Sequence, residues 1–147
     1  MSLKERLMAD LKEAMKSKDK LRKDVITMVR AAIKQKEVDE RVELDDSDIE
    51  NIISKQLKEK KASIEEFKKG NRQDLVDQTN DEIEILLKYL PEQLSDEELK
   101  EIIKKVIDEN EITSMKDIGK LMKNVMPLIK GKADGKQVNV IAKELLN

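Results

Sequence analysis

Apolar residues recur at every third or fourth position along most of this chain, and the positions between them are dense in lysine and glutamate. That spacing places the apolar side chains on one face of an α-helix, and the strict alternation typical of a half-buried strand does not compete with it. The sequence therefore predicts an all-α protein with seven amphipathic helices. Their apolar positions run over residues 3–15, 21–33, 49–67, 83–90, 99–107, 115–126 and 138–146.

Two helix starts carry the spacing of a capping box. Ser2 with Glu5, and Ser95 with Glu98, place a serine three residues before a glutamate. In this arrangement the serine oxygen and the glutamate side chain each accept a hydrogen bond from a backbone amide that the helix leaves free. We therefore predict that helices begin directly after Ser2 and Ser95.

Four acidic residues cluster before the third predicted helix: Asp45, Asp46, Asp48 and Glu50. Carboxylates at such short spacing suggest a divalent-cation site, but the ligand spacing and the turn glycine of an EF-hand are missing. Aspartate is also one of the residues preferred at helix N-caps. We interpret the cluster as helix capping, and we predict no metal site.

Glycine and proline mark the ends of two long helices. Gly70 is expected to end the third helix in the left-handed conformation that glycine adopts cheaply. Pro91 ends the fourth, because proline lacks an amide hydrogen and pushes the preceding residue out of helical geometry. We place a domain boundary here. It divides an N-terminal long-helix domain, residues 1–92, from a small C-terminal three-helix bundle, residues 93–147.

Composition narrows the possible chemistry. The chain has no cysteine and no histidine, which removes disulfides, thiolate nucleophiles and the commonest general base and metal ligand. Phe67 and Tyr89 are its two aromatic residues, too few for a surface that stacks single-stranded bases. We predict no catalytic residue and no cofactor. The N-terminus lacks a hydrophobic signal core and no apolar window reaches about 20 residues, so we expect no membrane association and a cytoplasmic location.

Charge is unevenly distributed along the chain. Residues 113–147 hold seven lysines against three acidic residues, a net charge of +4, whereas the preceding 112 residues carry a net charge of −6. A basic tail on an acidic chain favours contact with a phosphate backbone, in a salt-sensitive and sequence-tolerant manner. The alternative is that these lysines form a solvated helix face, which is the usual role of lysine-rich segments.

The segment from Lys130 to Lys136 is the most unusual local sequence, with two glycines and three lysines before a predicted helix. Free amides and the helix dipole favour an anion at such a position. It is not a P-loop, because the required spacing and a preceding strand are both missing. The alternative interpretation is purely local: Gly131 ends one helix and Asp134 caps the next.

Two segments carry a resemblance to a known family. They are Tyr-Leu-Pro-Glu-Gln-Leu at 89–94 and Lys-Gly-Lys-Ala-Asp-Gly at 130–135, the latter followed by Val-Asn at 138–139. With Gly-Asn-Arg-Gln-Asp-Leu at 70–75, they make the chain resemble the YqeY-like proteins of the GatB/YqeY family over essentially its full length. The resemblance implies two all-α domains. It also implies a relation to the tail of the tRNA amidotransferase B subunit, which helps to hold tRNA while separate domains catalyse.

The resemblance carries over a set of candidate residues. The lysines are assigned to phosphate contact, Asn139 to the loop backbone or a ribose, and the glycines and Asp134 to the turn that presents them. The candidate RNA-binding residues are Lys120, Lys123, Lys130, Lys132, Lys136, Asn139 and Lys143, and the candidate turn residues are Gly119, Gly131, Asp134 and Gly135.

Three functions are compatible with the sequence. The first is an amidotransferase-related accessory protein that contacts tRNA or another structured RNA. The second is a protein-interaction or scaffold module. Its small bundle would offer an apolar groove to a helix of an amidotransferase or another partner, and its long N-terminal helices would scaffold or dimerise. The family resemblance also implies a label of carbon–nitrogen ligase with glutamine as amide donor. That third function ranks last, because the chain lacks the catalytic domains and an obvious nucleophile–base pair.

Overall fold

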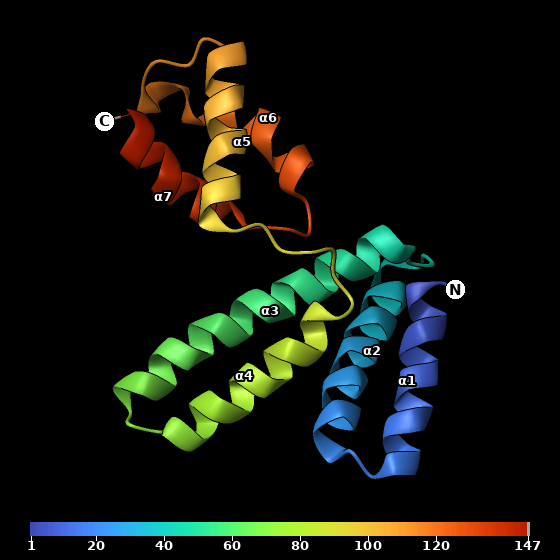
Figure 1. Cartoon of the computed structure of the whole chain (residues 1–147). Helices are drawn as coiled ribbons and strands as arrows, with labels where there is room; N and C mark the ends of the chain where they lie inside the picture. The colour runs from blue at the N-terminus through green and yellow to red at the C-terminus, as the bar shows by residue number, and fades with distance from the viewer. Residues whose placement is uncertain (147) are drawn as a thin grey trace. The chain divides into compact units, whose positions relative to one another are not determined.

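A computed structural model describes residues 1–146, and within them the chain is all-α, as predicted (Figure 1). It divides into two compact units, Met1–Leu90 and Pro91–Asn147, called unit 1 and unit 2 below. The helices are α1 Leu3–Ser17, α2 Lys20–Glu40, α3 Asp46–Lys69, α4 Gln73–Leu87, α5 Asp96–Glu109, the 3₁₀ helix η1 Met115–Asp117, α6 Ile118–Ile129 and α7 Gly135–Leu146.

Unit 1 consists of two helical hairpins, α1 with α2 and α3 with α4, which pack on each other (Figure 1). Each helix contributes one apolar stripe to a shared core. Leu7, Ile26, Ile53 and Leu86, one from each helix, are fully buried. Burying a side chain of this size contributes about 1.5–3 kcal/mol, so the stripes stabilise the four helices together.

Unit 2 has a core of its own, built from α5, α6 and α7. Leu99, Ile103, Leu121, Val125 and Val138 are buried at its centre. No described residue belongs to both cores. The division observed in the structure lies next to the predicted boundary between residues 92 and 93. That the two parts are separate domains stays a prediction.

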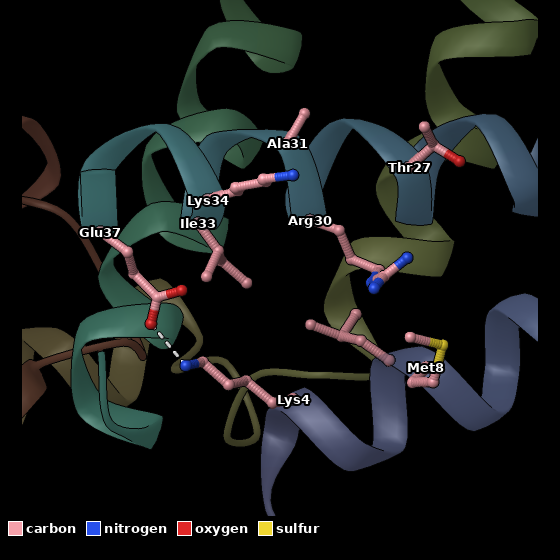
Figure 2. A pocket seen from close by; sticks show the side chains of 9 residues that line it. Lys4, Met8, Thr27, Arg30, Ala31, Ile33, Lys34 and Glu37 are labelled. Atoms are coloured by element: carbon pink, nitrogen blue, oxygen red, sulfur yellow. Dashed lines mark hydrogen bonds and ion pairs between the residues drawn. The ribbon is translucent and has the colours of Figure 1, made fainter. Parts of the chain in front are cut away.

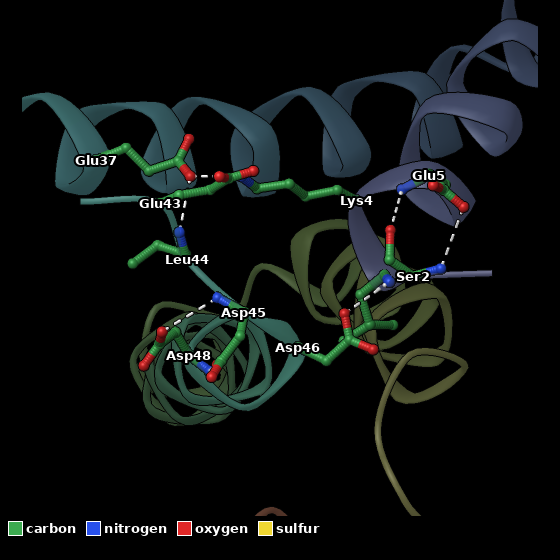
Figure 3. A network of polar contacts seen from close by, with 10 residues as sticks. Ser2, Lys4, Glu5, Glu37, Glu43, Leu44, Asp45, Asp46 and Asp48 are labelled. Atoms are coloured by element: carbon green, nitrogen blue, oxygen red, sulfur yellow. Dashed lines mark hydrogen bonds and ion pairs between the residues drawn. The ribbon is translucent and has the colours of Figure 1, made fainter.

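Helix capping explains Asp45 and Asp48 of the acidic cluster, as expected. Asp45 accepts a hydrogen bond from the Asp48 amide at 2.9 Å, and the Asp48 side chain accepts one from the Asp45 amide at 3.2 Å. Asp46 accepts a hydrogen bond at 2.9 Å from the amide of Leu3, the first residue of α1 (Figure 3). The capping boxes predicted at Ser2 and Ser95 are both confirmed.

The end of α3 differs from the prediction. Gly70 has a φ of −86°, and the left-handed residue is Asn71, with a φ of 56°. Asparagine tolerates this region because its short polar side chain bonds locally. The left-handed residue that follows α3 is therefore Asn71, one residue later than predicted.

The helix before Pro91, α4, ends earlier than predicted, at Leu87 instead of residue 90. The Tyr89 amide bonds the Leu86 carbonyl at 3.0 Å, and the Leu90 amide bonds the Leu87 carbonyl at 3.2 Å. These bonds span three residues, so the chain tightens into turns before it reaches the proline.

Tyr89 fastens this last segment of unit 1 to α1. Its hydroxyl donates a hydrogen bond to Asp10, and the Arg6 guanidinium lies 4.7 Å from the centre of its ring. Arg6 also donates to the Lys88 carbonyl at 2.7 Å, and Arg22 lies 3.3 Å from Asp10. Burial raises the pKa of the Tyr89 hydroxyl, and the bond to Asp10 raises it further. The Tyr89 hydroxyl is therefore a neutral hydrogen-bond donor that links the end of unit 1 to α1.

Candidate nucleic-acid interface

The loop between α6 and α7 is a compact turn. Gly131 has a φ of 76°, in the left-handed region that glycine adopts without strain. The amides of Lys132 and Ala133 both donate to the Ile129 carbonyl, at 2.8 and 3.1 Å. The last turn of α6 is thus closed by the loop itself.

Two residues at the start of unit 2 hold this loop in place. The Gln93 side-chain amide donates to the Gly131 carbonyl at 2.6 Å and to the Pro91 carbonyl at 3.0 Å. The Leu94 amide donates to the Lys132 carbonyl at 3.0 Å. The two segments that carried the family resemblance therefore lie in direct contact. Sequence reasoning gave Gln93 no role, because nothing in its local spacing indicates a partner 38 residues away.

Asp134 caps α7. Its carboxylate accepts a hydrogen bond from the Gln137 amide at 2.9 Å, and the Gln137 side chain accepts one from the Asp134 amide at 2.9 Å. The carboxylate occupies a position where an anion at the helix N-terminus would bind. This geometry favours the local interpretation of the loop, and it leaves phosphate contact to the lysine side chains.

The two remaining candidate glycines differ. A side chain at Gly135 would meet the Met122 methyl carbon at 3.2 Å and the Met126 sulfur at 3.9 Å, so α7 begins in close contact with α6. Gly119, expected in a turn, lies in the first turn of α6, and a methyl group there would meet open space. The structure gives no steric reason for glycine at position 119.

The candidate lysines are all exposed, but they are not gathered at one point. Lys120 and Lys123 lie in the first half of α6, and the Lys120 ammonium donates to the Asn110 carbonyl at 3.0 Å. The loop residues Lys130 and Lys132 lie at the other end of the helix, about 15 Å away along its axis. On α7, the candidate positions 136, 139 and 143 share one face because of their helical spacing.

The surroundings of these lysines are unequal. Among the described residues, Lys123, Lys132 and Lys143 have no carboxylate within ion-pair distance. Lys136 lines a hollow of about 560 Å³ between α5 and α7 whose rim also holds Asp96 and Glu97. These carboxylates reduce the positive potential beside Lys136. The loop and α7 lysines away from them are the stronger candidates for phosphate contact.

A comparison with protein families matches residues 4–146 to the family described as Yqey-like protein. The chain belongs to this family. The match covers nearly the whole chain, so it confirms the family resemblance predicted from the two segments that meet at the α6–α7 loop.

Relatives of the chain are named "Altered inheritance of mitochondria protein 41, mitochondrial". The one from Lachancea thermotolerans is 46% identical over 85 residues, 57% of this chain and 46% of the relative. The one from Pyrenophora tritici-repentis is 35% identical over 130 residues, 87% of this chain and 71% of the relative. The one from Saccharomyces cerevisiae strain YJM789 is 30% identical over 135 residues, which are 91% of this chain and 64% of the relative. The chain thus spans about half the length of the first of these relatives.

The comparison corrects one prediction. A cytoplasmic location was expected, yet these relatives are named as mitochondrial proteins. The expectation rested on the missing signal core at the N-terminus, and that feature does not determine the compartment in which a protein of this family acts.

Two further findings concern residues 1–146. No helix in this range is long and apolar enough to cross a membrane. The same residues contain no cluster of acidic side chains that could hold a metal ion.

Proposed function

We propose that the chain is an RNA-contacting accessory protein, whose unit 2 binds the phosphates of tRNA or another structured RNA through exposed lysines. The observation that carries the proposal is the anchored α6–α7 loop. Gln93 and Leu94 hold the backbone carbonyls of Gly131 and Lys132, so the exposed Lys132 side chain projects from an anchored turn. A fixed backbone lowers the entropy lost when the loop meets a partner.

The binding would be electrostatic and independent of sequence. Each phosphate that a lysine neutralises releases counterions, so the logarithm of the affinity falls by about 0.7–0.9 for each contact and each tenfold rise in salt. Two aromatic residues in the whole chain leave little scope for base stacking. The proposal assigns no bond-making step to the chain. An amidotransferase activity would depend on a partner that holds the catalytic groups.

The test is the binding of bulk tRNA to the purified chain over a series of salt concentrations. Replacing Lys130, Lys132 and Lys136 by glutamate should weaken binding at least tenfold and flatten the salt dependence. A matched variant replaces Lys55, Lys58 and Lys61 on α3, which changes the net charge equally in unit 1. Equal losses in the two variants would mean that binding follows net charge alone, against the proposal.

A protein-interaction module is the second candidate function. Leu128 on α6 and Val140 on α7 are 55% and 53% exposed, so they offer apolar area that a partner could bury. A partner that covers them would bind through apolar area and would respond weakly to salt. Retention of a binding partner at high salt would therefore favour this function over RNA contact.

A further inference from the structure

A hollow of about 660 Å³ lies between α1 and α2 in unit 1. Figure 2 shows the side chains that line it, and we call it the α1–α2 groove. Its floor is apolar: Leu7 and Ile33 lie at the bottom, 0% and 5% exposed. Met8 forms one wall and is 37% exposed. The core of unit 1 therefore reaches the surface here.

The apolar strip continues along α1. Met8, Leu11 and Met15 follow the helical repeat and share one face. Met15, the last of them, is 58% exposed and lines a second hollow near the turn between α1 and α2. Methionine side chains adapt their shape to different apolar partners, and they are frequent on surfaces that accept helices.

Basic residues line the α2 side of the groove. Arg30 and Lys34 are four residues apart on α2, and Lys23 lies two turns before Arg30 on the same side of the helix. None of the three has a carboxylate within ion-pair distance among the described residues. This side of α2 therefore presents three positive charges that unit 1 does not neutralise.

One end of the groove is closed by an ion pair. Lys4 of α1 bonds Glu37 of α2 (Figure 2). Glu43 lies 3.8 Å from the same ammonium. Glu37 is the single acidic residue that lines the hollow. Because Lys4 neutralises it, the charge that remains is that of Arg30 and Lys34.

We propose that the α1–α2 groove docks an amphipathic helix of a partner protein, with apolar residues facing Met8 and acidic residues facing Arg30 and Lys34. The groove combines an apolar floor with a basic rim, the complement of such a helix. α1 has 15 residues, so it can support a partner helix of about four turns.

The same features argue against two other occupants. A second copy of the chain would bring its own Arg30 and Lys34 to the same basic face, which opposes pairing by charge repulsion. A lipid surface would be met by protruding apolar side chains. In this groove Leu7 and Ile33 lie at the bottom of a hollow instead. The acidic helix is the occupant that satisfies both the shape and the charge.

The test uses a synthetic peptide of about 15 residues, held helical by side-chain bridges, with leucines along one face and glutamates beside them. A second peptide carries lysines in place of the glutamates, and a third has a scrambled order. We expect the first to bind the full-length chain with a Kd of about 10 μM, and the other two at least tenfold more weakly.

Variants of the chain locate the binding. Replacing Arg30 and Lys34 by glutamate should lower the affinity for the first peptide at least tenfold and raise the affinity for the lysine peptide. Met8→Asp should lower the affinity for the first peptide. The double variant Lys55→Glu with Lys58→Glu on α3 should leave that affinity unchanged. Circular dichroism checks that each variant remains helical.

Several results would overturn the proposal. The first is that the three peptides bind equally, or that the glutamate peptide shows no saturable binding. The second is that reversing the charges of Arg30 and Lys34 leaves the binding of the glutamate peptide unchanged. The third is that the chain forms a dimer that Met8→Asp abolishes, or that it binds anionic lipid vesicles more tightly than the glutamate peptide. The outcome is separable from RNA contact, because the variant of Lys130, Lys132 and Lys136 should bind the peptide normally.

Discussion

Charged side chains connect different helices in unit 1, whereas several lysines of unit 2 face solvent without a carboxylate partner. In unit 1, Arg22 of α2 lies 3.3 Å from Asp10 of α1, and Lys60 of α3 lies 3.6 Å from Glu82 of α4. In unit 2, an ion pair joins Lys105 and Glu109 within a single helix at 3.9 Å. Both units have an apolar core, so they differ in how their charges are used.

The difference teaches where partners should be sought. Lysines that are already paired gain little from a new anion, because they must first give up the old one. Among the described residues, Lys123, Lys132 and Lys143 of unit 2, and Arg30 and Lys34 on α2, have no carboxylate to release. An anionic partner gains most at unpaired cations, and the two proposed surfaces combine such cations with an anchored loop in unit 2 and with an apolar groove in unit 1.

The largest effect is expected from a cavity in the core of unit 2. Leu121→Ala should lower its free energy of unfolding by about 2–5 kcal/mol, because Leu121 is fully buried. If the two units fold independently, hydrogen exchange should rise in residues 96–146 and stay unchanged in residues 3–87. Leu7→Ala is the matched variant in unit 1, with the reverse pattern. A rise in both units after either change would contradict independent folding.

Tyr89→Phe should lower the free energy of unfolding by about 1.5 kcal/mol at neutral pH, because it removes the hydrogen bond to the Asp10 carboxylate. It should also change the response to alkali. The folded state raises the pKa of Tyr89 above its ordinary value of 10.0. The unfolded chain therefore ionises first, and wild-type stability falls as pH rises above about 10, a loss that the variant should lack.

Tyr89 is the single tyrosine, and the chain has no tryptophan, so tyrosinate absorbance reports this residue alone. Ionisation of the folded chain at the pH of free tyrosine would contradict the predicted shift.

Gln93→Ala should lower the stability of unit 2 by about 1 kcal/mol, because two hydrogen bonds to backbone carbonyls are lost. Amide exchange should accelerate at Lys132 and Ala133, whose loop the side chain holds. Glu92→Ala, at the exposed neighbouring position, is the control and should change neither quantity. An unaltered loop in the Gln93 variant would remove the main support for a preformed basic turn.

The smallest effect is expected at Glu37. The bonds from Lys4 and from the Leu44 amide lower the pKa of Glu37 below its ordinary value of 4.5. Its contribution to stability is therefore present above that value and lost as pH falls through the lowered pKa. Glu37→Gln should show a smaller drop in Tm on acidification, measured between about pH 6 and pH 3. Identical profiles would show that the exposed ion pair contributes nothing measurable.

The sequence predicted the features that depend on near neighbours. Apolar periodicity identified the seven α-helices, and spacing of three residues identified the capping boxes at Ser2 and Ser95. The exceptions are also local: Asn71 took the left-handed position assigned to Gly70, and Gly119, expected in a turn, lies in the first turn of α6.

Contacts between distant residues could not be predicted in this way. Gln93 bonds the Gly131 carbonyl 38 residues away, and Tyr89 bonds Asp10 across 79 residues. The α1–α2 groove likewise depends on how two helices pack, since Met8 and Arg30 have no relation in sequence. The candidate lysines were recognised by composition, but their separation along α6 required the structure.

The central claim is that unit 2 contacts RNA through lysines on and beside the α6–α7 loop. The most direct measurement is tRNA affinity over a salt series, for the wild type, the variant with glutamate at 130, 132 and 136, and the α3 control. The account predicts binding that weakens steeply with salt and that only the loop variant loses. Binding that is equal in all three proteins, or absent at low salt, would contradict it.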